Sequence, residues 1–332
     1  MADPLSLVIV GIVLALIFDF GNGFHDAANS IATVIATQVL SMRQAVLLAA
    51  ACNFIAAFVF GVAVANTIGK GIVDVAIVTP LLVNAGLVGG IIWNYATVFV
   101  GIPVSSSHSL IGGLIGAAIA AVGFGALNIG GILTIVAFIF IAPIIGTLAA
   151  IVFSIIVLWI FQGQSMGWTN KLFRKLQLVS VSIYSLGHGT NDAQKTMGVI
   201  SLLLFSAGFL GSTFYVPFWV VIMSHLTIAT GTLFGGWNVV KTLGTRLTNL
   251  KPFQGFCAET GGALIIIVCS SFGIPVSTTH VISGAIAGVG LTRRTSAVRW
   301  KTMRRIVMAW FLTLPATAVM GFIAYKALLG VF

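Results

Sequence analysis

The stretch Gly101-Ile102-Pro103-Val104-Ser105-Ser106-Ser107-His108 returns as Gly273-Ile274-Pro275-Val276-Ser277-Thr278-Thr279-His280, 172 positions further along the chain. Proline disfavours helix at itself and at the residue before it, whereas serine and threonine are favoured as helix N-caps. Each copy therefore predicts a loop that enters a helix, with hydroxyls and unpaired backbone N–H groups at its start. Because helix N-termini bind anions, two copies on one chain predict a single anion held between them.

The composition places these motifs in a membrane. The 332 residues are 59% hydrophobic and 7% charged, with a mean hydropathy of +1.14, which excludes an ordinary soluble domain. Some apolar runs exceed the roughly 20 residues that one crossing needs, and others are half that length. We therefore expect an all-α polytopic membrane protein with roughly 10–12 membrane segments. The run Leu5–Phe18 lacks a basic leader and a cleavage site, so we expect a retained first helix.

The basic residues indicate orientation and not a nucleic-acid partner. The net charge is +10, and Lys and Arg gather in three segments, at 171–175, 241–251 and 293–305. The positive-inside rule places all three in the cytoplasm. We expect no nucleic-acid partner, because no nucleic-acid fold signature accompanies these segments. The three cysteines show no metal-ligand spacing, and we interpret them as small apolar residues.

A second repeat divides the chain into two halves. The stretch Gly21–Ala27 (GNGFHDA) aligns with Gly187–Ala193 (GHGTNDA) at an offset of 166. We expect one repeat over 1–162, a basic cytoplasmic linker over 163–176, and a second repeat over 177–332. Equivalent loops carry opposite charge bias, which predicts inverted topology with both termini outside. Inverted repeats are typical of secondary transporters that bind their substrate near the bilayer midplane.

Two acidic residues occupy equivalent positions of the repeat, Asp26 and Asp192. A charge at the bilayer centre costs about 2.5–3.5 kcal/mol on insertion scales, so such residues usually mark ion or substrate pathways. Asparagines nearby supply neutral oxygens, and the glycines of both motifs allow unwound backbone whose carbonyls could ligate an ion. These oxygens suit a hard cation such as Na⁺, and they suit a proton relay equally.

Other polar residues of the motifs have less specific interpretations. His108 and His280 follow the two hydroxyl triplets, and they could bind a ligand or make helix-packing hydrogen bonds. Lys195 lies three residues after Asp192, so we expect an ion pair within one helical turn. A direct contact between Lys195 and an anion is the alternative. The glycines after each triplet predict close helix packing.

The motifs together resemble a known family. The stretches Gly23–Ser30 (GFHDAANS) and Gly189–Gln194 (GTNDAQ), with Pro-Val-Ser-x-x-His at Pro103 and Pro275, resemble the paired signatures of the inorganic phosphate transporter (PiT) family. The resemblance covers nearly the whole chain. It implies a sodium- or proton-coupled phosphate symporter with inverted repeats and re-entrant helical hairpins, assembled as a homodimer in the lipid bilayer. A short central segment, in place of the long one of animal relatives, indicates a prokaryotic member in the cell inner membrane.

The motifs and the family resemblance together give the expected site. The resemblance adds Glu259, which matches a glutamate of the family. The expected phosphate ligands are Ser105, Ser106, Ser107, Ser277, Thr278, Thr279, Asn29 and Gln194. The expected Na⁺ ligands are Asp26, Asp192, Asn22, Asn191 and Glu259. His25, Asn66 and Lys195 depart from the family pattern.

We therefore expect a secondary transporter that couples phosphate to Na⁺ by alternating access, with no covalent cofactor and no enzymatic activity. Proton coupling, a metal–phosphate substrate and sulfate transport are the alternatives, since helix N-termini do not distinguish tetrahedral anions. A channel would need more polar residues in series. A hydrolase would need an activating carboxylate beside His108 or His280, and none is adjacent in sequence.

Overall fold

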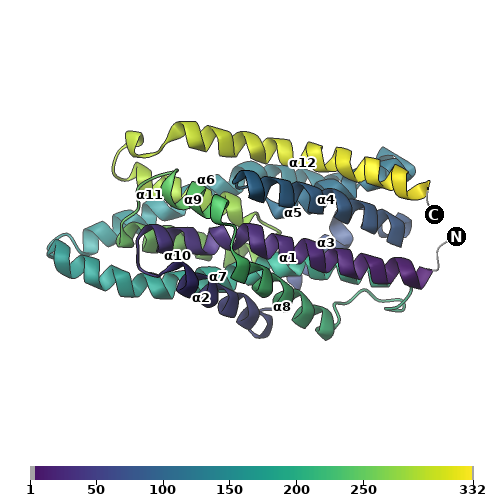
Figure 1. Ribbon diagram of the computed structural model, residues 1–332, viewed down its shortest axis with the longest axis horizontal. Helices are drawn as coiled ribbons and strands as arrows, with labels where there is room; N and C mark the ends of the chain where they lie inside the picture. The colour runs from purple at the N-terminus through teal and green to yellow at the C-terminus, as the bar shows by residue number, and fades with distance from the viewer. Residues whose placement is uncertain (1–3, 331–332) are drawn as a thin grey trace.

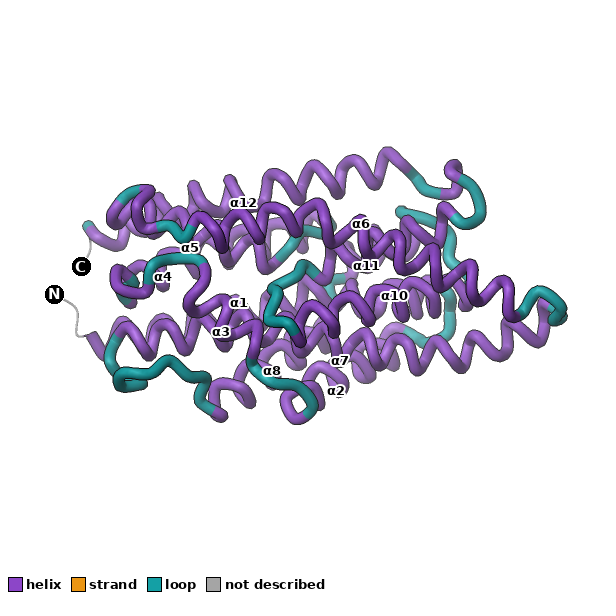
Figure 2. The backbone as a smooth tube through the Cα atoms, turned by 180° about the vertical axis from the view of Figure 1, so that it is seen from behind, coloured by secondary structure: helices purple, strands orange, loops and turns teal. Residues whose placement is uncertain are grey.

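The computed structural model describes residues 4–330, and within that range its regular secondary structure is helical, without a named strand (Figures 1 and 2). The helices are α1 (Pro4–Ala36), α2 (Met42–Ile55), α3 (Ala63–Gly71), α4 (Pro80–Val100), α5 (Ser106–Val122), α6 (Ile129–Ile160), α7 (Met166–Ser206), α8 (Phe218–Phe234), α9 (Trp237–Thr245), α10 (Pro252–Ser271), α11 (Thr278–Leu291) and α12 (Trp300–Leu329).

Several helices are long and apolar enough to cross a membrane. Among the described residues, five pass this test alone: α1, α4, α6, α10 and α12. Two bent pairs, α2–α3 at 82° and α8–α9 at 74°, raise the number to seven if each pair is one span. Helix α7 has 41 residues, about 60 Å of helix, but its polar residues lower its hydropathy. The expectation of an all-α polytopic membrane protein with half-length segments is confirmed.

The order of elements repeats within the chain. Each series has a long helix, a bent pair, a helix of about 20 residues, a short helix and a long helix with an internal proline. These prolines, Pro143 in α6 and Pro315 in α12, are again 172 positions apart. The first helices of the two series, α1 and α7, run antiparallel, because Asp19 contacts Thr196 while Thr37 contacts Gln177. The inverted repeat is confirmed.

Each series contains a helical hairpin whose tip is one of the repeated proline motifs. In α4–α5 and α10–α11 the two helices pack on each other. The tips begin at Gly101 (φ +74°) and Gly273 (φ +71°), a left-handed conformation that favours glycine. Each hairpin then packs on the long final helix of the opposite series, α5 on α12 and α11 on α6. A Cβ at Gly288 or Gly116 would collide with backbone of that helix, so the expected small-residue packing is confirmed.

Most of the expected linker, 163–176, forms the start of α7, which begins at Met166 with Ser165 as its N-cap. One local expectation is wrong. The glycine motifs are not unwound, because α1 and α7 continue through them as helix. These glycines instead allow close approach: a Cβ at Gly189 would lie 2.7 Å from the Cα of Asn53, and one at Gly23 would overlap the Ile228 carbonyl.

The basic segments gather at one end of the molecule. Helix α1 begins and α12 ends at the same end, while the α6–α7 turn and the α11–α12 connection lie at the other (Figure 1). The segments 171–175 and 293–305 therefore share the end opposite to the start of α1. This arrangement suits the positive-inside rule. The chain termini, expected on the outer side, fall outside the described residues.

Cysteine labelling tests the orientation. Exposed positions at the basic end, Lys175→Cys and Arg299→Cys, should react with an impermeant thiol reagent only from the cytoplasmic side. Exposed positions in the α5–α6 and α7–α8 connections, Gly125→Cys and Ser212→Cys, should react only from outside. The three native cysteines are buried and provide a low background. Labelling of Gly125→Cys and Lys175→Cys from the same side would contradict the orientation.

Candidate functional site

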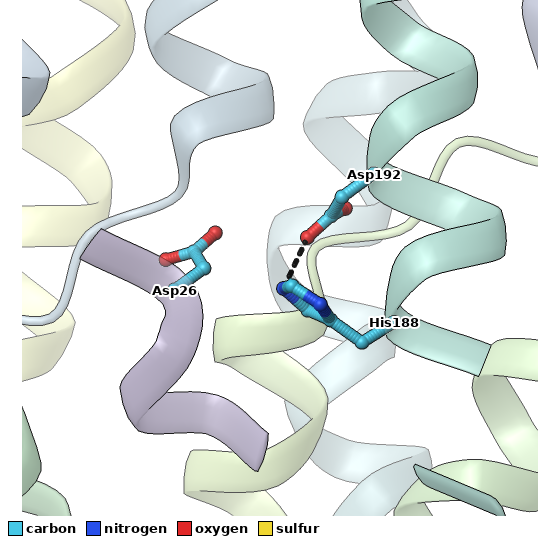
Figure 3. A group of neighbouring side chains, drawn as sticks. All are labelled: Asp26, His188 and Asp192. Atoms are coloured by element: carbon cyan, nitrogen blue, oxygen red, sulfur yellow. Dashed lines mark ion pairs between the residues drawn. The ribbon is translucent and has the colours of Figure 1, made fainter. Parts of the chain in front are cut away.

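Two buried carboxylates face each other where α1 meets α7. Asp26 projects from α1, and Asp192 and His188 project from α7 toward it (Figure 3). Asp26 and Asp192 are each only 2% exposed. One ligand atom of each of these three side chains lies within 4.8 Å of the others, a spacing at which one cation could contact all three. The repeat thus brings its two equivalent carboxylates to one place.

The two hydroxyl triplets converge on the same carboxylates. From the first repeat, Ser106 Oγ donates to Asp26 Oδ2 at 3.1 Å. From the second, Thr279 Oγ1 donates to Asp26 Oδ1 at 3.3 Å, and Thr278 Oγ1 donates to Asp192 Oδ2 at 2.9 Å. Asn29 of α1 donates to Thr279 Oγ1 at 2.9 Å. Side chains from α1, α5, α7 and α11 therefore share one buried hydrogen-bonded network.

The helix starts at this network carry unpaired backbone donors. Ser105 and Ser277 are the N-caps, accepting from the backbone N–H of His108 at 3.2 Å and of His280 at 3.3 Å. The remaining first-turn N–H groups have no partner within a helix. They belong to 106–107 in α5 and 278–279 in α11, all buried residues. The His108 and His280 rings, 4.9 Å apart, pack the two helix starts together. Such paired N-termini suit an anion.

Each carboxylate also has a nitrogen partner. Lys195 Nζ donates to Asp192 Oδ1, as the spacing predicts, and to the carbonyl of Val276 at 2.9 Å. His188 Nε2 lies 3.1 Å from Asp192 Oδ2, without the alignment of a hydrogen bond. His25 Nδ1 lies 2.7 Å from Asp26 Oδ1, and its Nε2 lies 3.2 Å from the Ile102 carbonyl. These contacts lower the cost of burying charge.

Several residues expected at the site lie at its edge or outside it. Asn191 donates to the Val276 carbonyl at 3.1 Å, and its Oδ1 is buried without a partner, as is Asn22 Oδ1. Gln194 accepts from the backbone N–H groups of Val64 and Ala65 at 2.8 and 3.2 Å. It therefore caps the start of α3, whose own N-cap residue makes no side-chain hydrogen bond.

Glu259 lies in a second polar cluster. Its carboxylate accepts from Thr33 Oγ1 at 2.5 Å, from Gln177 Nε2 at 2.9 Å and from Ser180 Oγ. Thr33 is two turns beyond Asp26 on α1, about 10 Å along the helix axis. The structure thus separates Glu259 from the pair of aspartates with which the sequence had grouped it.

A stripe of polar residues on α1, which the repeated motifs did not predict, joins these two clusters. Polar residues recur on α1 at helical spacing, at Asp19, Asn22, Asp26, Asn29 and Thr33, and Thr37 continues the spacing just after the helix ends at Ala36. This stripe faces α7, where Thr196 donates to Asp19 at 2.8 Å and Gln177 accepts from Thr37 at 2.8 Å. The three- and four-residue spacing would have revealed it, had the glycine motif been taken as helical.

A basic cavity of about 170 Å³ lies beside the α4–α5 tip. Residues 101–103 of the tip form one wall, and Arg246, Lys301 and Arg305 line another part. The tip leads directly into the hydroxyl triplet of α5. A concave surface with three positive charges raises the local anion concentration, so this cavity suits an approach to the buried site.

The fold and the site together define a membrane transporter built as an inverted repeat. Residues 22–321 match the phosphate transporter family, and the chain belongs to that family. Relatives named "Probable low-affinity inorganic phosphate transporter" occur in Rhizobium meliloti (strain 1021) and Bacillus subtilis (strain 168). The first is 54% identical, covering 98% of this chain and 97% of its own length. The second is 43% identical, covering 99% of both.

A solved structure named "The sodium-dependent phosphate transporter" has the same fold. It matches with a TM-score of 0.87 at 26% identity, covering 98% of this chain and 100% of that chain. The resemblance to phosphate transporters drawn from the four motifs is confirmed, as is the expectation of a transporter and not an enzyme.

The basic cavity predicts a salt-dependent flux. Neutralising Arg246 and Arg305 to Gln should slow phosphate exchange across proteoliposomes several-fold near 0.01 M salt. The deficit should shrink near 1 M, because the Debye length falls from about 30 to 3 Å. The control is Lys171→Gln with Lys175→Gln, which removes two charges at the same end but outside the cavity. A loss of exchange rate that does not change with salt, or no loss at low salt, would contradict electrostatic steering of phosphate by the cavity.

Proposed function

We propose that this protein is a secondary transporter that carries inorganic phosphate together with a cation, Na⁺ in the first place. The phosphate would lie between the starts of α5 and α11, and the cation beside it at the aspartates. The observation that carries the proposal is the convergence of both hydroxyl triplets on Asp26 and Asp192, one triplet from each repeat. The similar solved structure, named as sodium-dependent, supports sodium as the coupling ion.

The helix starts supply the donors that a tetrahedral oxyanion needs. In each repeat, two backbone N–H groups and the side-chain hydroxyls can point at the same ligand, at the positive ends of α5 and α11. Hydroxyls that donate to the aspartates in this structure, those of Ser106, Thr278 and Thr279, can rotate toward an anion when a cation satisfies the carboxylates. Binding of the two ions is thus mutually dependent.

This dependence provides the coupling. Phosphate without a cation would place its charge beside two carboxylates in a poorly solvated site, where like charges repel strongly. A cation offsets that repulsion, and the anion in turn favours the cation. Asp26, with the buried oxygens of Asn22 and Asn29 on the same face of α1, is the proposed cation ligand with the fewest competing cationic partners.

Alternating access would come from movement of the two inverted repeats, 1–162 and 177–332, about the shared site. The basic end of the molecule would face the cytoplasm, and both chain termini would lie outside. The surrounding bilayer, which the long helices α6 and α12 cross, would be the cell inner membrane. The hairpin tips lie at the contact between repeats, so a change in their packing would open one side of the site or the other.

Proton coupling is the second candidate, and the geometry of His25 favours it. Both of its ring nitrogens face oxygen acceptors, Asp26 Oδ1 and the Ile102 carbonyl. For both contacts to be hydrogen bonds, either both ring nitrogens carry a proton, or Nε2 carries one and a protonated Asp26 donates to Nδ1. The His25–Asp26 pair could therefore hold a transported proton where the first candidate holds Na⁺.

Removing one hydroxyl from either repeat tests the shared anion. Ser106→Ala and Thr278→Ala should each weaken phosphate binding by about 10- to 150-fold, the equivalent of 1.5–3 kcal/mol for a hydrogen bond to a charged group. Calorimetry with saturating sodium measures the effect. Ser283→Ala, a buried serine further along α11, is the matched control. A response in one repeat alone would show that the anion is not shared.

Removing one carboxylate charge tests the cation site. Asp26→Asn should abolish cation-driven phosphate uptake while leaving the protein folded, because the amide keeps the shape but loses the charge that binds a cation. Asp74→Asn is the matched control, since Asp74 only caps a short turn near the surface. Normal cation-dependent uptake by a folded Asp26→Asn protein would remove Asp26 from the mechanism.

A further inference from the structure

In the second repeat, the buried ammonium of Lys195 lies beside the carboxylate of Asp192. Lys195 is only 2% exposed, and its Nζ contacts Asp192 Oδ1 and the Val276 carbonyl. A carboxylate oxygen and a backbone carbonyl oxygen are the ligands that a hard monovalent cation also uses. The hydroxyl of Thr278 donates to the other oxygen of Asp192, so protein groups engage both of its oxygens, as they do for Asp26.

The first repeat differs at the equivalent position. Shifting Lys195 and Asp192 back by 166 gives Asn29 and Asp26, so a neutral amide stands where the second repeat has an ammonium. Asn29 uses its Nδ2 to bond Thr279, while its Oδ1 is buried and has no hydrogen-bond partner. A free amide oxygen near a carboxylate can ligate a cation, whereas an ammonium excludes one by charge and by occupancy.

We propose that the Lys195 ammonium permanently fills the cation position of the second repeat, so that it replaces one coupling ion. This inference rests on the proposed cation-coupled phosphate transport. The two aspartates carry two negative charges, and Lys195 neutralises one of them within the protein. One transported cation then neutralises the remaining carboxylate. A site with asparagine at both position 29 and position 195 would need two transported cations. Lys195 is therefore the residue that sets the ratio of cation to phosphate.

The test copies the first repeat into the second. Lys195→Asn recreates the Asp26–Asn29 pair, and ²²Na and ³²P-phosphate fluxes into proteoliposomes give the ion ratio. The sodium-to-phosphate ratio should rise by about one relative to the wild type, because the vacated position now accepts Na⁺. Lys195→Arg, which keeps the positive charge, should leave the ratio unchanged.

The converse variant keeps the inference testable if Lys195→Asn does not fold. Asn29→Lys places a second ammonium in the first repeat, and it should remove the sodium dependence of phosphate binding measured by thermal shift in detergent. A folded Lys195→Asn protein with the wild-type ratio would overturn the inference, as would Asn29→Lys with wild-type sodium dependence. A wild-type protein with no cation-driven phosphate flux would instead refute the proposed function itself.

Discussion

The burial of two carboxylates inside a membrane protein is the constraint on which the rest of the structure depends. Asp26 and Asp192 cannot be left without partners in a poorly solvated environment. Their partners come from four helices: hydroxyls at the starts of α5 and α11, and nitrogen groups on α1 and α7. The hairpins must therefore stop and turn at the depth of the aspartates, which the proline motif and the left-handed glycine at each tip allow.

The same constraint explains why the two repeats are similar at the centre and different at the flanks. Asp19 and Thr33, the partner of Glu259, lie two turns on either side of Asp26 along α1. Asp19 and Glu259 have uncharged equivalents in the opposite repeat: Ser185 stands at the position of Asp19, and Leu87 at the position of Glu259. A substrate ion moving along the α1–α7 contact would thus meet different polar groups on the two sides of a nearly symmetric centre.

The sequence predicted the architecture because the repeated motifs have local physical meanings. Proline, a hydroxyl N-cap and a following run of small residues specify a loop, a helix start and close packing, and the structure has all three at both tips. Opposite charge bias in equivalent loops predicted the inversion, which the antiparallel α1 and α7 bear out.

The sequence could not predict which hydrogen-bond partner each polar side chain would have. The glycines at 21, 23, 187 and 189 suggested unwound backbone, but tertiary packing uses their small size inside continuous helices. Gln194, adjacent in sequence to the site, turns away to cap α3, and Glu259 finds partners up to 226 positions away that no local pattern connects.

The central claim is that a cation and phosphate bind interdependently at one site and cross together. Its most direct test is phosphate accumulation in proteoliposomes with sodium and proton gradients imposed separately. An inward sodium gradient at equal pH should drive phosphate above its equilibrium distribution, and its dissipation should release the phosphate. Phosphate flux that only follows its own gradient, whichever cation gradient is imposed, would contradict the coupling of the two ions.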